Sequence, residues 1–379
     1  MRKKKMGPFT PQFGRRPASF IGRQDIINEL LDGIYDLNSP MRTTIISGVR
    51  GAGKTALLSD ICEELAEDKG WMVINVSASD EILSEIYDQL IYHSRELLPL
   101  NDFKLAGIEI GPPLAKINVQ KTIIEPASFY TKMMQVLDLL ENKNISIFIA
   151  IDEIKNIAPI KTLAITYQLL IRQEYEICLM MAGLPQYVIS IQNDKDLTFL
   201  KRSHHVFLKN IDLLSLRLEY ERIFGLEGKS FTPAALDLAY LSTGGYPYMY
   251  QLIGYYLWKD SSSIISEDEI KKAVNLSVAD LSKNVLSMAF NDLTETEQNF
   301  LIAMASDDET SKVEDIHKRM GKSRNYISQY RRTLIDLGMI EPVGHGLIRF
   351  TIPYMNVFLK EKIKEKSFVF AETNYNDKP

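Results

Sequence analysis

The sequence predicts an α/β protein with a parallel sheet, followed by a helical region and a C-terminal winged helix-turn-helix. Short apolar runs rich in β-branched residues alternate with helical stretches, which is typical of a parallel sheet covered on both faces. A glycine-rich turn at 48–55 separates the first run from a helix. A basic helix pattern at 323–337 follows a glycine-marked turn near the C-terminus.

Composition places the chain among ordinary globular proteins. It has 379 residues, of which 45% are hydrophobic and 25% charged, close to the globular average. At about 150 residues per domain, this length predicts two or three domains. The formal charge of −5 excludes a histone-like polyanion binder. It still allows a small basic module, because a phosphate backbone senses local charge.

Cysteine use and the N-terminus predict a soluble, cytoplasmic protein. Cys62 and Cys178 are too few for a disulfide framework and show no metal-ligand spacing. Prolines follow the basic start where a signal peptide would have its apolar core. No apolar run approaches the roughly 20 residues that span a bilayer, so we expect no membrane contact.

The expected sheet occupies the first part of the chain. Its five predicted strands are 43–47, 72–76, 145–151, 177–181 and 206–208. A period-two pattern around Gly111-Pro112-Pro113 predicts a hairpin inserted at 103–120. From 211 to 288 the pattern is helical, interrupted at 242–247.

Residues 48–55 match the pattern G-x-x-x-x-G-K-[ST] at every fixed position. Glycines let the backbone wrap so that its N–H groups face a polyphosphate, and the following helix adds its dipole. Lys54 is then expected at the β- and γ-phosphates, and the Thr55 hydroxyl at Mg²⁺. The alternative is an ordinary glycine-rich turn. The expected nucleotide-binding residues of this turn are Gly48, Val49, Arg50, Gly51, Ala52, Gly53, Lys54, Thr55 and Ala56.

An apolar strand that ends in Asp152 supplies the second half of the predicted site. Open α/β sheets bind ligands at the carboxyl edge of their strands. We expect Asp152 to orient Mg²⁺ and Glu153 to polarise the attacking water as a general base. The alternative is a solvated Asp-Glu turn after an ordinary strand.

With these motifs the sequence resembles AAA+ P-loop ATPases of the origin-recognition-complex-like group, from about Phe9 to Leu359. Residues 48–55 and 147–153 match the group's Walker A and Walker B motifs, and 20–24 match its opening motif F-x-G-R-x. The resemblance implies a P-loop AAA+ fold with a helical lid and a C-terminal winged helix. It also implies ATP and Mg²⁺ as cofactors, with Gly22 and Arg23 near the adenine.

Two positions depart from the group's pattern. The first sensor, a polar side chain after the fourth strand, is replaced by Ala182 and Gly183, with only Gln186 nearby. The second sensor, a lid arginine, is replaced by Gly245-Tyr-Pro, which resembles the G-x-P motif of signal-transduction (STAND) ATPases. These departures imply slow or conditional hydrolysis. The lid residues expected at the nucleotide are Tyr246 and Pro247.

The resemblance also implies an arginine finger, supplied by a neighbouring subunit from just before the fifth strand. Arg202 is the best-placed candidate in this sequence. The alternative is a surface arginine at a helix C-terminus. A finger in trans implies a homo-oligomer or a partner protein.

The last part of the chain predicts three helices and a wing. Helix patterns cover 294–305, 312–320 and 323–337, with Gly321 at the turn and Ser323 as N-cap. A two-stranded wing follows at 340–352. The third helix is expected to face the core with Ile327, Tyr330, Leu334 and Leu337.

The outer face of that helix combines arginine with amide and hydroxyl side chains, as phosphate and base-edge contacts require. We expect duplex DNA as its partner. The alternatives are a merely solvated face or a protein–protein module. The expected DNA contacts are Arg324, Asn325, Ser328, Gln329, Arg331, Arg332 and, on the wing, His345.

The chain is therefore expected to comprise a basic arm (1–19), a nucleotide-binding domain (20–210), a helical lid (211–288), a winged helix (289–362) and a polar tail (363–379). The expected function is slow or conditional ATP hydrolysis with duplex DNA binding. The alternative is a STAND-like switch that holds ATP and packs its winged helix internally. A partner ATPase of a mobile element or defence system would share the same residues.

Overall fold

The computed structural model describes residues 7–12, 22–99 and 127–364. The predicted hairpin at 103–120, the rest of the basic arm and residues 365–379 lie outside this part. The chain divides into two compact units. We call Ile26–Ser47 with Leu57–Phe207 the sheet unit, and Met1–Asp25, Gly48–Ala56 and Leu208–Pro379 the C-terminal unit. None of the described helices is both long and apolar enough to cross a membrane.

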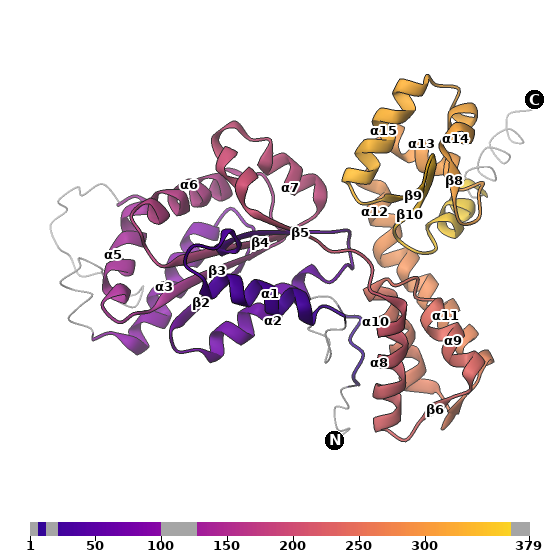
Figure 1. Ribbon diagram of the computed structural model, residues 1–379, viewed down its shortest axis with the longest axis horizontal. Coiled ribbons are helices and arrows are strands. Elements are labelled where there is room, and N and C mark those ends of the chain that lie inside the picture. Colours follow the sequence, from indigo (N-terminus) through magenta and orange to yellow (C-terminus); the bar gives the residue numbers. More distant parts are fainter. Residues whose placement is uncertain (1–6, 13–21, 100–126, 365–379) are drawn as a thin grey trace, which may run out of the picture. The chain divides into compact units, whose positions relative to one another are not determined.

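A five-stranded parallel sheet forms the centre of the sheet unit (Figure 1). Its strand order is β2-β3-β4-β1-β5. All five predicted strands are confirmed, with ends that differ by one or two residues. The strands are β1 (Thr43–Ser47), β2 (Trp71–Ser77), β3 (Ser146–Asp152), β4 (Ile177–Gly183) and β5 (His204–Phe207).

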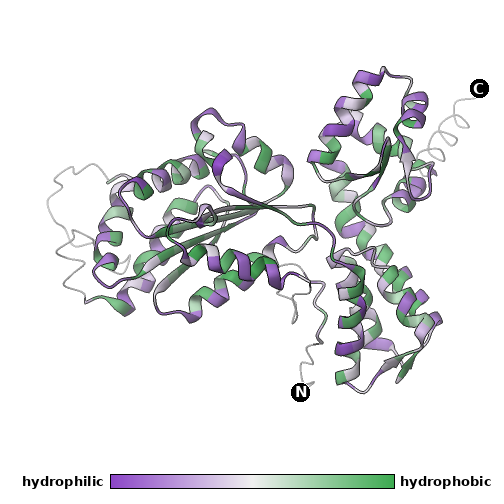
Figure 2. Ribbon diagram, in the orientation of Figure 1, coloured by the Kyte–Doolittle hydropathy of each residue, from purple (hydrophilic) through white to green (hydrophobic). Residues whose placement is uncertain are grey.

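Helices cover both faces of this sheet, which explains why its strands are apolar without alternation. Alternate strand residues such as Ile149 and Leu179 pack into one core with α3, α5, α6 and α7, while α1 and α2 cover the other face (Figure 1). Figure 2 shows the strands in hydrophobic green. The helices are α1 (Gln24–Tyr35), α2 (Lys54–Glu67), α3 (Ile82–Leu97), α5 (Phe129–Glu141), α6 (Ala158–Arg172) and α7 (Pro185–Gln192), with short turns η1 (Pro40–Arg42) and η2 (Lys195–Arg202).

The C-terminal unit begins with the expected helical region. It contains a feature that the sequence did not predict, a parallel pair of two-residue strands, β6 (Ser230–Phe231) and β7 (Ile264–Ile265). The last helix, α11, continues through a π-helical turn, η3 (Ser282–Leu286), into α12 (Ser287–Asn291). The four helices of this region before the π-helical turn are α8 (Leu213–Leu226), α9 (Pro233–Leu241), α10 (Pro247–Asp260) and α11 (Glu267–Leu281).

Residues 294–350, here called the C-terminal module, have the element order expected of a winged helix-turn-helix. Gly321 ends α14 in the left-handed region at φ 60°, and the Ser323 hydroxyl accepts the Tyr326 N–H at the start of α15. A short strand, β8, joins the wing as a third strand. The elements are α13 (Glu295–Met304), β8 (Ser311–Lys312), α14 (Val313–Met320), α15 (Arg324–Asp336), β9 (Ile340–Gly344) and β10 (Leu347–Phe350), and a helix at 355–364 follows.

Residues 7–12 of the predicted basic arm are anchored to the helical lid. Phe9 is only 4% exposed and packs among aromatic rings of α8 and α10. Gly254 makes room for it, since a Cβ there would strike the Phe9 ring. The Thr10 N–H donates to Gln251 Oε1 at 2.8 Å. The rings around Phe9 belong to Tyr220, Phe224, Tyr250 and Trp258.

We expect Phe9→Ala to lower the free energy of unfolding by about 3–5 kcal/mol, because it leaves a cavity among these rings. Urea denaturation of the full chain measures the loss. Leu226→Ala is the control, since Leu226 is 75% exposed on α8 and should change stability by less than about 0.5 kcal/mol. Equal losses in the two variants would contradict the anchoring role of Phe9.

Candidate functional site

The glycine-rich loop leaves β1 at Gly48 and enters α2 at Lys54. Gly51 and Gly53 have φ of 71° and 92°, which other residues adopt only with strain. The Lys54 ammonium donates to the carbonyl oxygens of Gly48 and Val49, at 2.9 and 3.0 Å. The loop therefore folds back over its own lysine, as a phosphate cradle requires.

Arg23 supports the loop from the N-terminal side. Its guanidinium is 5% exposed and donates to the carbonyl of Ala52 at 3.4 Å and that of Lys209 at 2.5 Å. Burial lowers the pKa of Arg23 to about 10, so it stays charged at neutral pH. Arg23 was expected near the adenine, and the structure places its guanidinium against the loop backbone.

Tyr246 supports the loop from the lid. Its side chain is fully buried, and its hydroxyl donates to the Arg50 carbonyl. A Cβ at Gly51 would meet this hydroxyl. Burial raises the pKa of Tyr246, so the phenol remains a donor. The tyrosine that stands at the second-sensor position therefore contacts the loop itself.

The glycines before Tyr246 form a junction within the C-terminal unit. Gly244 and Gly245 have φ of 57° and 75°, and the Gly245 carbonyl accepts the Ile211 N–H at 2.7 Å. Asn210 Nδ2 donates to the carbonyls of Gly244 and Thr351, both at 3.1 Å. The motif thus joins the lid to the connector from β5 and to the end of the C-terminal module.

Pro247 is the first residue of α10. Its fixed φ suits that position, where no intrahelical N–H bond is lost. Pro247 is half-buried, and its contribution here is to begin the helix directly after the tyrosine that contacts the loop.

The end of β3 carries the two acidic residues of the candidate site. Asp152 is half-buried, and its Oδ1 accepts the Glu153 N–H at 2.8 Å. Glu153 is exposed and has φ of 54°, a left-handed conformation that costs about 1–2 kcal/mol for an L-residue. Such strain clusters at functional sites. Because the strands are parallel, Asp152 ends at the same sheet edge as Ser47, with β4 between them.

The end of β4 explains the missing first sensor. Ala182 and Gly183 are buried, and a Cβ at Gly183 would strike the Ile154 side chain. Ile154 follows the acidic pair, and its N–H donates to the Ala182 carbonyl at 2.9 Å. A side chain at position 183 would therefore require Ile154 to move. Gln186 is half-buried on α7.

Arg202 ends η2, two residues before β5, and is exposed. This place matches the expected position of an arginine finger, and equally that of a surface arginine at a helix end. No contact with another described residue assigns Arg202 a role.

The third helix of the C-terminal module presents most of the predicted residues to solvent. Ile327 and Leu334 are buried, whereas Tyr330 and Leu337, expected in the core, are half-buried. The exposed residues are Arg324, Asn325, Ser328, Gln329 and Arg332, and His345 is exposed at the wing tip.

Arg331 is the exception and corrects the prediction of an outer position. It is half-buried, and its Nε is buried without a hydrogen-bond partner. The reason is its spacing: Arg331 lies four residues after Ile327 and three before Leu334, on the core-facing stripe.

Ion pairs within the C-terminal module neutralise several of its arginine side chains. Arg324 pairs with Glu314 at 3.0 Å, and Arg349 pairs with Glu341 on the wing at 2.6 Å. Arg319 donates to Asp307 and to the Ala303 carbonyl. Arg332 is exposed on α15 and has no ion pair within 4 Å among the described residues, so its charge is not neutralised by a carboxylate of the described chain.

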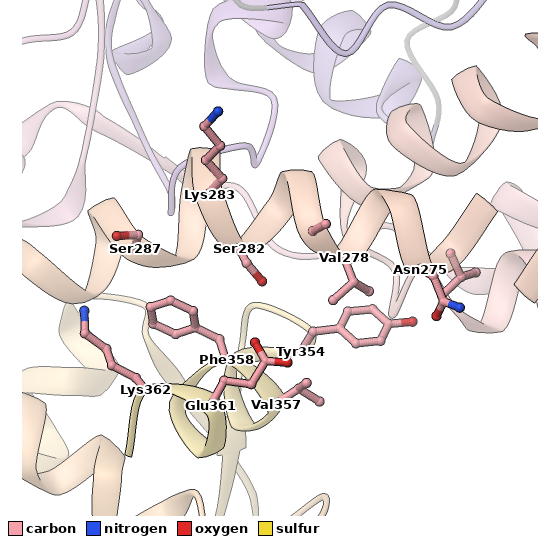
Figure 3. Close-up of a pocket in the computed structure, with 12 residues that line it drawn as sticks. Asn275, Val278, Ser282, Lys283, Ser287, Tyr354, Val357, Phe358, Glu361 and Lys362 are labelled. Atoms are coloured by element: carbon pink, nitrogen blue, oxygen red, sulfur yellow. The ribbon is translucent and has the colours of Figure 1, made fainter. Parts of the chain in front are cut away.

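A cavity of about 810 Å³ lies between the α11–α12 helix and the helix at 355–364 (Figure 3). Its walls mix apolar and charged side chains, and Figure 3 shows Tyr354, Phe358 and Glu361 facing the long helix. The Lys362 ammonium lies over the rings of Phe290 and Phe358. The π-helical turn η3 forms part of the wall. The contacts among residues 7–12, 22–99 and 127–364 do not identify an occupant of this cavity.

The described residues contain no group of three or more His, Cys, Asp or Glu side chains arranged to hold a metal ion. Cys62 and Cys178 are free and buried. Burial raises the pKa of each thiol to about 12, so neither is a reactive thiolate at neutral pH.

Comparisons with known proteins identify the fold. A Walker-type ATPase of Pyrococcus abyssi superposes with a TM-score of 0.61 at 14% identity, covering 91% of this chain and 97% of that chain. The chain has the P-loop AAA+ fold. The Aeropyrum pernix ORC2 protein, solved as ADPNP–ADP complexes, has a TM-score of 0.57 at 15% identity and covers 94% of this chain and 98% of its own.

The AAA+ fold of this chain extends over most of its length, and its fold resembles that of the origin-recognition-type ATPases. Residues 283–359 match the model of a domain of unknown function, DUF8462. No curated protein sequence matches the chain.

We expect Gly51→Ala to lower the free energy of unfolding by about 1–3 kcal/mol, because alanine is strained at this φ and its Cβ meets the Tyr246 hydroxyl. Tyr246→Phe removes that hydroxyl. Urea denaturation of the double variant should show a loss smaller than the sum of the single losses.

Gly225→Ala is the matched control, since no atom lies within 4 Å of its added Cβ on helix α8. This variant should not lose stability. If the stability losses of Gly51→Ala and Tyr246→Phe were strictly additive in the double variant, the Tyr246 hydroxyl would not contact the loop at Gly51.

Proposed function

We propose that the protein binds ATP with Mg²⁺ in the glycine-rich loop and hydrolyses it slowly or conditionally. The observation that carries the proposal is the loop itself, with Gly51 and Gly53 at positive φ and Lys54 folded over the Gly48 and Val49 carbonyls. The fold and its solved relatives support it. The acidic pair after β3 supplies the residues that hydrolysis requires.

Each residue has a role in the proposed reaction. The loop N–H groups and Lys54 would hold the β- and γ-phosphates. Glu153 would orient the attacking water and accept its proton while the γ-phosphoryl group transfers. The strained backbone of Glu153 supports this role, because exposure alone would not require a left-handed residue.

The oxygen donors of the site fit Mg²⁺, which prefers hard oxygen ligands. Thr55 offers an exposed hydroxyl at the start of α2, and Asp152 offers a carboxylate at the end of β3. We propose that these two residues hold the ion. Mg²⁺ would neutralise charge that develops on the phosphate oxygens.

The replaced sensors support slow turnover. Gly183 has no side chain, and Ile154 packs where its Cβ would lie. Tyr246 uses its hydroxyl on the loop backbone. Neither position therefore offers a charge to the γ-phosphate, and a stimulating partner would have to supply it. Arg202 of a neighbouring copy is one candidate.

We expect Lys54→Ala to weaken ATP binding at least about tenfold, because it removes a charged hydrogen bond to phosphate. Glu153→Gln should bind ATP as the wild type does but hydrolyse it about 10²–10⁴ times more slowly. Fluorescent ATP titration and phosphate release measure the two effects. Lys69→Ala is the control, since Lys69 is exposed in the turn after α2. Normal ATP binding by Lys54→Ala would contradict the proposal.

We further propose that the C-terminal module binds duplex DNA through α15 and the wing. The support is the exposed set on α15, which combines Arg332 with Asn325 and Gln329. Arginine suits phosphates, and amide side chains suit adenine edges. The ion pair of Arg324 with Glu314 is exposed, so a DNA phosphate could replace the carboxylate.

The double variant Arg324→Ala/Arg332→Ala should weaken duplex DNA binding and reduce the slope of log K against log salt by about two, one per lost phosphate contact. Fluorescence anisotropy at several salt concentrations measures both. Arg217→Ala, on lid helix α8, is the control and should leave both unchanged. An unaltered slope in the double variant would refute DNA contact by α15.

A STAND-like switch is the second candidate, and the Gly245-Tyr-Pro junction favours it. Such a switch would hold ATP with little turnover and use its module for internal packing. ATPase activity measured with and without duplex DNA separates the candidates, because only the DNA-binding ATPase should be stimulated.

A further inference from the structure

One ion pair joins the phosphate loop to the start of the C-terminal module. Arg50 Nη2 lies 2.8 Å from Asp292 Oδ2, although the residues are 242 positions apart in the sequence. Asp292 directly follows the helix that runs from α11 through η3 to α12, and Thr294 then caps α13. The pair therefore reaches the point where the lid ends and the module begins.

The backbone of Arg50 is held, while its side chain has room to move. The Tyr246 hydroxyl binds the Arg50 carbonyl. The side chains of Arg50 and Asp292 are 29% and 39% exposed. A ligand that binds at the loop can therefore change the rotamer of the Arg50 side chain while its backbone stays in place.

Asp292 satisfies the Arg50 guanidinium only in part. Arg50 Nε is buried without a hydrogen-bond partner, and a buried unpaired donor is unfavourable. A polyphosphate presents several oxygens and can bind a guanidinium bidentately. A nucleotide in the loop would therefore compete with Asp292 for Arg50.

Because Asp292 lies between α12 and the first helix of the module, the loss of its partner Arg50 affects the start of the module. Asp292 is the C-cap residue of α12, where the helix dipole disfavours a carboxylate and favours a cation. Arg50 compensates this charge. When Arg50 turns away, the carboxylate repels the last carbonyls of α12, and Lys362, 3.4 Å from the Asn291 Oδ1 atom, remains as a nearby cation.

We propose that the Arg50–Asp292 pair is a latch that nucleotide opens. In the closed state Arg50 is paired with Asp292, so its guanidinium does not bind the phosphates and it connects the loop to the α12–α13 junction. Bound ATP draws Arg50 away and releases the junction. The inference rests on the proposed ATP binding and adds its regulation. Because coupling is reciprocal, a ligand that pulls the module from the loop raises ATP affinity by the same factor.

Asp292→Asn in the full chain tests the latch. It should bind a fluorescent ATP analogue about two- to five-fold more tightly than the wild type, the range expected for a partly exposed pair. Without nucleotide, hydrogen exchange of residues 287–304 should already match that of the ATP-bound wild type. Folding should be preserved, since a neutral side chain suits a helix C-terminus.

Asp292→Glu keeps the charge and should behave as the wild type does. Asp308→Asn is the matched control, because Asp308 pairs with Lys360 within the C-terminal unit at 3.2 Å, away from the loop. Unchanged or weaker ATP binding by Asp292→Asn, or wild-type exchange at 287–304 without nucleotide, overturns the latch. Failure of the wild type itself to bind ATP overturns the proposed function and the latch together.

Discussion

The glycine-rich loop at 48–55 needs hydrogen-bond donors from outside itself, because its glycines at positive φ turn the backbone out of any regular helix or strand. Lys54 supplies donors from the helix that follows. Arg23 and Tyr246 supply them from residues 29 positions before and 196 positions after their acceptors. The conformation of the loop therefore depends on distant segments of the chain, which is why the loop belongs to the same compact unit as the lid.

This dependence gives residues 244–246 a structural role in the loop as well as in the lid. Residues 244–246 bond to the connector at 210–211, while Asn210 also binds the Thr351 carbonyl and Tyr354 binds the Ser242 carbonyl. One small junction thus fixes the lid, the end of the module and, through Tyr246, the loop.

Local patterns predicted much of this structure. The apolar runs gave all five strands of the sheet, and the spacing of glycine, lysine and threonine identified the loop. The contacts of Tyr246 and Arg23 with the loop could not be predicted from the sequence, because they join residues far apart in the chain. The packing of Gly183 against Ile154 and the ion pair of Asp292 with Arg50 could not be predicted either, because no local pattern pairs these residues. Arg331 was misplaced for a local reason, since its spacing from Ile327 and Leu334 already put it on the buried stripe.

The burial of Phe9 among the rings of α8 and α10 makes the lid a composite of a segment before the sheet and helices after it. The aromatic core of the lid includes Phe9, which precedes the sheet and contacts Tyr220, more than 200 positions later in the chain. Such non-local closure slows folding, because the chain must be ordered before the contact stabilises it. Residues 211–288 cut out alone would therefore carry an open aromatic pocket and would not reproduce the lid of the whole chain.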